Sequence, residues 1–280
     1  MKWESPLSIP AGRSGKYEIT KTVFPAMTDM NVVNLRTALF SGVKPEKVIF
    51  YEPVTFHYLR EDGNILMSDI PEEQYDHIHV VEKCSGTVLV AGLGLGYIAT
   101  LLSQKKSVNK VIIVELNKDV IELVWKHIKT SKMEIIHKDI WDYLKETKQR
   151  FDYVYLDTWS GTGETEFYET TLPMRRASYA VLKKEIKQPR KRVLAWKEEV
   201  MRGQISTNFI TLLQIPPVLK ELMDMPDEAF EKRYNDMWGK PKYYFWKWLR
   251  KTKPSKEKAM KEAIQYAQDY GEACWEKKWR

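Results

Sequence analysis

Three acidic residues come at or just after the carboxyl ends of short apolar runs, and these residues could do chemistry. They are Glu115, Asp139 and Asp157. In a parallel sheet the carboxyl ends of the strands meet at one edge, where α/β proteins bind their ligands. A carboxylate at Glu115 can accept both ribose hydroxyl hydrogens, one at Asp139 can accept from an adenine amino group, and Asp157 lies where a reacting group would be. The pattern predicts a nucleoside cofactor.

A glycine turn precedes the first of these acids. Gly92, Gly94 and Gly96 follow the apolar run 88–91, and such glycines permit a tight turn with backbone N–H groups close to a ligand. Dinucleotide enzymes typically have G-x-G-x-x-G, but here the third position of that pattern is Tyr97. The spacing G-x-G-x-G is common in S-adenosylmethionine enzymes. We therefore expect S-adenosylmethionine as the cofactor, with a nicotinamide cofactor as the alternative.

Leu116 and Ile140 complete the expected cofactor-binding set, with Ile140 against the adenine ring. Each acid also has a structural interpretation. Glu115 could be a helix-capping or solvated residue, Asp139 could cap the helix predicted to follow it, and Asp157 could be a turn residue. Three acids after three successive strands favour one shared site over three separate structural roles.

The elements that must position these residues follow from hydrophobic periodicity. Alternating strands and helices over residues 74–204 predict an α/β, Rossmann-like methyltransferase fold, which is a mainly parallel sheet with helices on both faces. Residues 1–73 predict a leader and a small β-domain that could cover the cofactor mouth. Residues 205–280 predict a helical, basic, tryptophan-rich extension interrupted by prolines.

The stretch over residues 59–199 resembles the polyamine aminopropyltransferases (spermidine synthases) and their class I S-adenosylmethionine-dependent methyltransferase relatives. The resemblance lies in a hairpin with a following tyrosine, the second strand of the core and the segment after the fourth strand. It implies that Glu115 holds the ribose and that Asp139 lies beside the adenine. Tyr75 matches the tyrosine after the hairpin and Asp157 the first aspartate of the catalytic loop, so these two are the expected catalytic residues.

Two positions depart from that family. Leu95 stands where the family has an aspartate that helps to bind the amine, and Ser160 replaces the second aspartate of the catalytic loop. Binding of a polycation needs carboxylates against its ammonium groups. The sequence therefore predicts an S-adenosylmethionine-dependent methyltransferase acting on an unknown small-molecule acceptor. The alternatives are a polyamine aminopropyltransferase that uses decarboxylated S-adenosylmethionine, and a non-catalytic protein that binds nucleosides or nucleic acid.

Positive charge is concentrated near the carboxyl end of the sequence. Residues 231–280 contain fourteen Lys or Arg and seven Asp or Glu, a balance equal to the net charge of +7 of the whole chain. Basic residues interleaved with tryptophans could bind a nucleic-acid strand. Phe245, Trp246 and Trp248 at helical spacing favour instead a helix packed on the protein, and we prefer that interpretation. Because related enzymes are commonly dimers, a homodimer is a further expectation.

Several classes of protein are disfavoured by composition. Two cysteines in 280 residues make neither a disulfide framework nor a zinc site. His77 and His79 would point apart on a helix, so no metal is expected. The start of the sequence has no apolar signal core, and glycines interrupt the longest apolar stretch. We therefore expect a cytoplasmic protein without membrane contact.

Overall fold

The chain forms two compact units in the computed structural model, which describes residues 3–159, 161–234 and 241–269. The first unit contains residues 1–161 and 173–197, and the second contains residues 162–172 and 198–280. No helix in these described ranges is both long and apolar enough to cross a bilayer.

These units do not coincide with the three ranges 1–73, 74–204 and 205–280 expected from the sequence. The amino-terminal strands and the parallel sheet form one body. One reason is a close contact between them, in which Ser14 Oγ donates to Asp119 Oδ1 at 2.7 Å. The space beside Gly15 is also filled by the Asp119 carboxylate.

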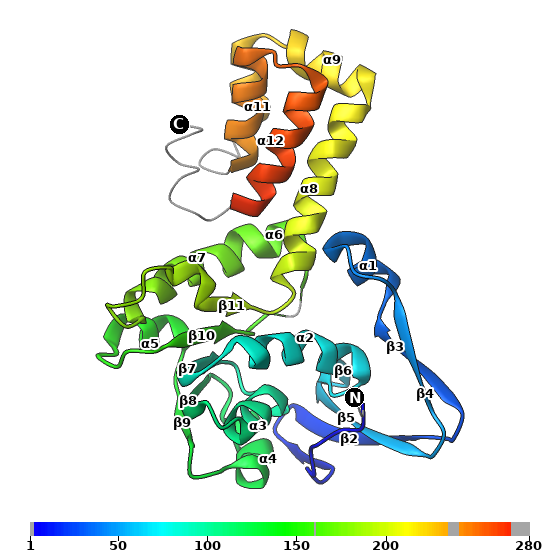
Figure 1. Cartoon of the computed structure of the whole chain (residues 1–280), viewed down its shortest axis with the longest axis vertical. Helices are drawn as coiled ribbons and strands as arrows, with labels where there is room; N and C mark the ends of the chain where they lie inside the picture. Colours follow the sequence, from blue (N-terminus) through cyan, green and yellow to red (C-terminus); the bar gives the residue numbers. More distant parts are fainter. Residues whose placement is uncertain (1–2, 160, 235–240, 270–280) are drawn as a thin grey trace. The chain divides into compact units, whose positions relative to one another are not determined.

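A five-stranded parallel sheet forms the centre of the first unit (Figure 1), in the order β11-β10-β7-β8-β9. Its elements and the flanking helices are, in chain order, α2 (Pro71–Lys83), β7 (Gly86–Ala91), α3 (Tyr97–Gln104), β8 (Val108–Glu115), α4 (Lys118–Ile128), β9 (Met133–His137), α5 (Ile140–Glu146), β10 (Tyr153–Leu156), α7 (Leu172–Ser178), η2 (Tyr179–Val181), η3 (Pro189–Lys191) and β11 (Val193–Ala195). This strand order is a Rossmann-like α/β fold, as the sequence predicted.

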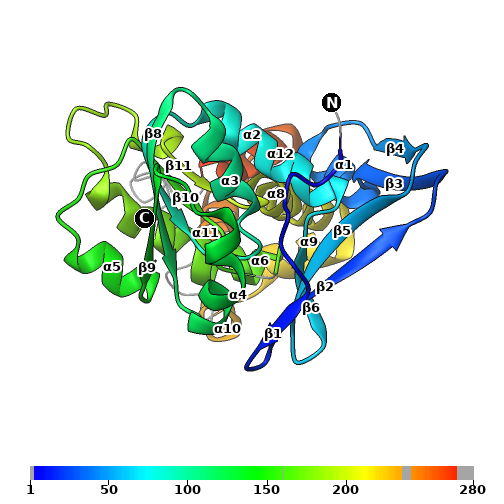
Figure 2. The ribbon, with the colours of Figure 1, turned by 90° about the horizontal axis from the view of Figure 1, so that it is seen from below.

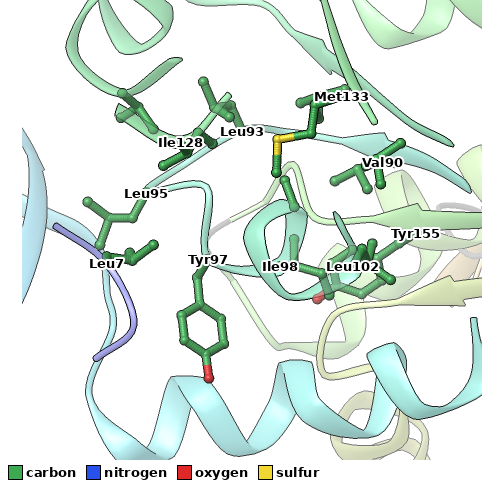
Figure 3. Close-up of a cluster of buried hydrophobic side chains, with 14 of the residues drawn as sticks. Leu7, Val90, Leu93, Leu95, Tyr97, Ile98, Leu102, Ile128, Met133 and Tyr155 are labelled. Carbon is green, nitrogen blue, oxygen red and sulfur yellow. The ribbon is translucent and has the colours of Figure 1, made fainter. Parts of the chain in front are cut away.

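The central strands are apolar on both faces because helices cover both faces. In β7, Val88 and Val90 are fully buried in a cluster with side chains of α2, α3 and α4. Leu89 and Ala91 alternate to the other face and pack with α5 and α7. Figure 2 shows α5 on the opposite side of the sheet from α3 and α4. Figure 3 shows part of the first cluster, where the Tyr97 hydroxyl points toward α2.

The order of strands in the sheet reverses at β7. Strands β8 and β9 are added on one side of β7, and β10 and β11 on the other. Beyond the paired ends of β7 and β10, Asp157 N donates to Ala91 O at 3.0 Å. The carboxyl ends of these two strands therefore lie side by side, which is where open α/β sheets bind ligands.

The amino-terminal part of the first unit is rich in strands, as predicted. Its elements are β1 (Gly12–Ser14), β2 (Tyr17–Phe24), β3 (Thr28–Val33), α1 (Leu35–Ser41), β4 (Glu46–Phe50), β5 (Val54–Glu61) and β6 (Asn64–Ser68). Strands β1, β2, β5 and β6 form one antiparallel sheet, and β3 and β4 form a separate ribbon. Helix α1 was not predicted. It begins at Asn34, whose side chain accepts from Thr37 N, and it ends at Gly42 with φ 73°.

The second unit is helical within its described residues. Its elements are α6 (Glu164–Glu166), the π-helix η1 (Phe167–Thr171), α8 (Glu198–Gln214), α9 (Pro216–Asp224), α10 (Asp227–Arg233), α11 (Pro241–Thr252) and α12 (Lys256–Asp269). Helices α9 and α11 begin at prolines, as expected from the fixed φ of proline. The helical stretch over residues 167–181 is divided among η1, α7 and η2, because a π-turn interrupts the α-helical pattern.

Three aromatic residues of α11, Tyr243, Phe245 and Trp246, lie in the core of this second unit. Phe245 is fully buried and Trp246 is 2% exposed. Both pack on Phe209 of α8, with ring-centroid distances of 4.8 and 5.5 Å. The preferred interpretation, a packed helix, therefore holds for Phe245 and Trp246. Trp248 is partly buried and packs against Phe245, with ring centroids 5.7 Å apart. Trp238, Trp275 and Trp279 lie outside the described residues.

Candidate functional site

The glycine turn after β7 is needed for contacts within the protein itself. Gly92, Gly94 and Gly96 all have positive φ, at 95°, 50° and 72°, which side chains other than glycine rarely adopt. A Cβ on Gly92 would meet the Asp157 carbonyl oxygen at 2.2 Å, and one on Gly96 would meet Ile128 Cδ1 at 2.3 Å. These two glycines thus let the loop pass against β10 and α4.

Gly94 lets a methionine side chain rest on the loop. A Cβ there would lie 2.1 Å from Met67 Sδ, and the same sulfur accepts from Leu95 N at 3.2 Å. The Leu95 side chain is fully buried in the core, so this position offers no carboxylate or other polar group to a ligand. Within the described residues, the Gly94 N–H has no hydrogen-bond partner, and it is the loop amide available to a ligand.

The carboxylate of Glu115 is turned toward this loop. Its Oε2 accepts from Leu93 N at 2.7 Å and its Oε1 accepts from Asn117 N at 2.8 Å. The residue is only 7% exposed. Each carboxylate oxygen has a second lone pair, so both oxygens retain the capacity to accept a hydroxyl hydrogen. Glu115 therefore holds the loop in place while its two oxygens keep lone pairs for further hydrogen-bond donors.

The remaining residues of the expected cofactor set have different surroundings. Asp139 caps α5, because its Oδ1 accepts from Trp141 N at 2.7 Å, and its second oxygen is left for a ligand. Ile140 is 7% exposed and packs in the core. Leu116 is 58% exposed beside Glu115. Of these two apolar side chains, Leu116 is the one with an exposed surface.

Asp157 contacts a buried histidine that the sequence analysis did not associate with it. His77 Nε2 lies 3.1 Å from Asp157 Oδ2, and the two residues are 80 positions apart. His77 extends from α2 and its side chain is 2% exposed, whereas the Asp157 side chain is 20% exposed. Asp157 therefore has one oxygen held from within the protein and a partly open face toward solvent.

The surroundings of His77 favour the doubly protonated ring. Its Nδ1 lies 2.6 Å from Glu73 O, which can only accept, so Nδ1 donates. Nε2 faces the Asp157 carboxylate and donates as well. Burial alone lowers the pKa of His77, but the hydrogen bond and charge of Asp157 and the Glu73 carbonyl raise it to about 9. The edges of Tyr97 and Tyr155 fix the ring, with centroids 5.6 and 5.9 Å away.

Further carboxyl groups gather on α2 beside this pair. Lys197 Nζ lies 3.2 Å from Asp76 Oδ2 and 3.3 Å from Glu72 Oε1. Burial raises the pKa of Asp76, and the charge of Lys197 opposes that rise. Burial raises the pKa of Glu73 to about 7, although His77 and Lys197 lower it. No side chain among the described residues donates a hydrogen bond to the Glu73 carboxylate.

Counted together, this cluster has more acids than bases. Four carboxyl groups, those of Asp157 and of three α2 residues, are accompanied by two cationic side chains. The carboxyl groups belong to Glu72, Glu73, Asp76 and Asp157, and the cations are His77 and Lys197. The strand mouth is therefore an environment that suits a positively charged ligand.

Tyr75, the other expected catalytic residue, is half-buried on α2 and packs edge-on against His79, with ring centroids 4.6 Å apart. The two histidines of α2 point to different surroundings, since His77 is buried and the His79 side chain is 50% exposed. Among the residues that the structure describes, no group of three His, Cys, Asp or Glu could hold a metal ion. Ser160 lies outside those residues.

Several residues of this site were missed from the sequence. The spacing of Glu73 and His77, four positions apart on a predicted helix, was the available signal for two of them. Nothing local marks Met67 or Lys197, because both reach the site from elements distant in the chain.

No protein-family model and no curated protein sequence matches the chain. Among solved structures, spermidine synthase from Thermotoga maritima is 21% identical over 45% of each chain, with a TM-score of 0.35. A spermidine synthase in complex with the transition-state analogue AdoDATO is 24% identical over 45% of this chain and 46% of that chain, with a TM-score of 0.36. A precorrin-8w decarboxylase from Methanobacterium thermoautotrophicum is 15% identical over 38% of this chain and 54% of that chain, with a TM-score of 0.29. The chain thus spans about half the length of each of these proteins.

Proposed function

We propose that this protein is a transferase that moves an alkyl group from an S-adenosyl sulfonium cofactor to an amine. The observation that carries the proposal is the Glu115 carboxylate, buried at the end of β8 and bonded to the glycine turn at Leu93 N. This arrangement lies beside the point where the strand order reverses, as a nucleoside site in an α/β sheet requires. Gly94 N–H, Leu116 and the second oxygen of Asp139 complete a set that fits adenosine.

The chemistry asks little of the protein. When bound, the sulfonium supplies an activated carbon, whose bond to sulfur breaks as the acceptor nitrogen attacks it. Alignment of the acceptor is then the main contribution of the enzyme. The Asp157 oxygen that does not contact His77 can accept a hydrogen bond from an N–H of the amine. The proton that the amine loses then passes to a carboxylate or to water. His77 holds the Asp157 carboxylate in a fixed orientation.

The cluster of acids on α2 bears on the choice between methyl and aminopropyl transfer. The amino-acid part of S-adenosylmethionine has a carboxylate, which needs a cation or free N–H groups. The decarboxylated cofactor and a polyamine carry ammonium groups, which need carboxylates instead. The excess of carboxyl groups around Asp157 supports aminopropyl transfer from the decarboxylated cofactor to a polyamine. This support stands although Leu95 occupies the position of one aspartate that the spermidine synthases have. Methyl transfer to a small amine is the other candidate.

Calorimetry tests the proposal directly. S-adenosylmethionine, its demethylated product and decarboxylated S-adenosylmethionine are titrated separately into the protein. We expect a measurable heat of binding for at least one of these three compounds. The absence of binding heat for all three at high protein concentration would refute the proposed nucleoside site. Mass spectrometry after incubation with putrescine and either cofactor then separates the two candidates, because the transferred groups differ in mass.

A further inference from the structure

A second charged surface lies at the opposite ends of the same strands. A cleft of about 770 Å³ is lined by the end of α2, the start of β10 and the segment that leads into β11. Its lining residues are Lys83, Asp152, Tyr153, Glu185, Ile186, Lys187, Gln188, Lys191, Arg192 and Leu194. Asp152 and Asp157 bracket the four residues of β10, so roughly 16 Å of extended chain separates this cleft from the strand mouth.

Positive charge is strongly segregated into this region. Residues 1–230 contain equal numbers of basic and acidic side chains, 31 of each. Within them, the ten residues 183–192 contain six Lys or Arg and one Glu. The rest of that stretch therefore has an excess of acid, part of which is the cluster at the strand mouth. Such crowding of like charges disfavours the folded state unless an anion offsets it.

The basic segment is held in place by the protein, so the charges are preorganised. Arg175, 5% exposed, donates to Val193 O at 2.5 Å and to Arg190 O at 3.1 Å. Turn hydrogen bonds from Lys191 N to Gln188 O and from Arg192 N to Pro189 O fix the residues between. A rigid basic segment loses little conformational entropy when it binds an anion.

The acids in the cleft do not neutralise it. Asp152 Oδ2 accepts from Thr87 N at 2.7 Å and from Lys183 Nζ at 2.8 Å. Lys183 does not line the cleft, so the charge of Asp152 is balanced by a cation from outside the cleft. The lining cations Lys83, Lys187, Lys191 and Arg192 are then opposed by one remaining carboxylate, that of Glu185. One of the cations, the Arg192 guanidinium, is stacked over the Tyr153 ring at 4.5 Å and presents its donors at a fixed position.

We infer that this cleft binds a small anion with two or more phosphate groups, such as a nucleoside triphosphate or inorganic tripolyphosphate. Guanidinium and ammonium groups from two separate segments, the end of α2 and the stretch before β11, converge on one concave surface, which suits clustered phosphates. The volume lies within the range of small-molecule sites, whereas a nucleic-acid strand requires a longer track of cations. Ile186 and Leu194 offer an apolar wall that a nucleotide base could contact.

The test is calorimetric titration of the full chain with tripolyphosphate, with ATP and with a single-stranded oligonucleotide at 0.15 M salt. The double variant Lys187→Gln/Lys191→Gln should weaken binding of the small anions roughly tenfold or more, because each charge-assisted hydrogen bond contributes about that factor. Lys184→Gln is the matched control, since it removes an exposed charge of the same segment that does not line the cleft. It should change affinity less than twofold. Unchanged melting temperatures of the variants show that both remain folded.

Tighter binding of ATP than of tripolyphosphate, weakened in the double variant, supports a nucleotide in this cleft rather than at the Glu115 site, and equal binding supports recognition of the phosphates alone. The inference is overturned by any of three results. These are no heat with either small anion at 1 mM, equal loss of affinity in the control variant, or tighter binding of the oligonucleotide than of both small anions. Because the readout does not involve transferase activity or the adenosyl cofactor, failure here and failure of the proposed function are separate results.

Discussion

Replacement of His77 by glutamine should remove a component of stability that decreases as pH rises above neutrality. The pKa of His77 is raised from 6.5 to about 9 in the folded chain. A histidine whose folded pKa is raised stabilises the protein fully below the unfolded value, and that stabilisation is lost as pH rises through the folded value. This rise in the pKa of His77 corresponds to a stabilisation of roughly 3 kcal/mol at low pH. The window of loss is therefore about pH 6.5 to 9.

The assay is urea unfolding of both proteins at half-unit steps from pH 6 to 9.5, monitored by tryptophan fluorescence. The wild-type free energy of unfolding should fall by about 1.4 kcal/mol per pH unit in the middle of that window, and the His77→Gln variant should lack this component. His79→Gln is the matched control, because the His79 side chain is 50% exposed on the same helix. Parallel pH profiles for wild type and His77→Gln would refute the charged pair with Asp157.

Three further predictions concern other parts of the chain. Glu115→Ala should weaken cofactor binding by roughly 1.5–3 kcal/mol in calorimetry, because charge-assisted hydrogen bonds contribute about that much; unchanged affinity would mean that the ribose lies elsewhere. Gly92→Ala should lower the free energy of unfolding by more than about 3 kcal/mol, since its Cβ would meet backbone at 2.2 Å, whereas Gly42→Ala, with open space, should cost only about 1–2 kcal/mol for its positive φ. Equal losses in the two glycine variants would argue against the packed turn. Trp246→Ala should lower stability by about 3–5 kcal/mol in thermal or urea unfolding; a loss below about 1 kcal/mol would show that this ring is not a core residue.

The regular elements of the parallel sheet were predictable because each has a strong apolar pattern and a clear end signal. Helix α2 has a proline at its first position, which is a start signal that the sequence itself shows. Helix α4 begins after Asn117, a residue type typical of a helix start, although the Asn117 side chain makes no capping hydrogen bond. Helix α1 was missed because it has only 7 residues, fewer than the roughly 11–18 over which helical periodicity can be judged. Its Leu35 and Leu39 are 76% and 70% exposed, so packing in a core does not explain this helix either.

Only some residues of the candidate site could be predicted from the sequence. Residues that follow strands could be placed from the order of elements alone, and this is how Glu115, Asp139 and Asp157 were found. The capping role of one Asp139 oxygen could be established only from its 2.7 Å contact with Trp141 N. Partners of Asp157 could not be found in this way. His77 reaches it across 80 residues of chain, and only the packing of α2 against the sheet brings the two together.

The second unit takes its residues from two separate parts of the chain. Glu164 Oε2 accepts from Asn208 Nδ2 at 2.9 Å, and the Phe167 ring lies under the Arg202 guanidinium at 4.8 Å. A truncation after residue 197 would therefore leave an eleven-residue insertion in the remaining protein without the helix it packs on, and its buried phenylalanine would face water. The carboxyl-terminal helices are thus not a detachable tail, and a deletion meant to test them should also replace the insertion at 162–172 with a short linker.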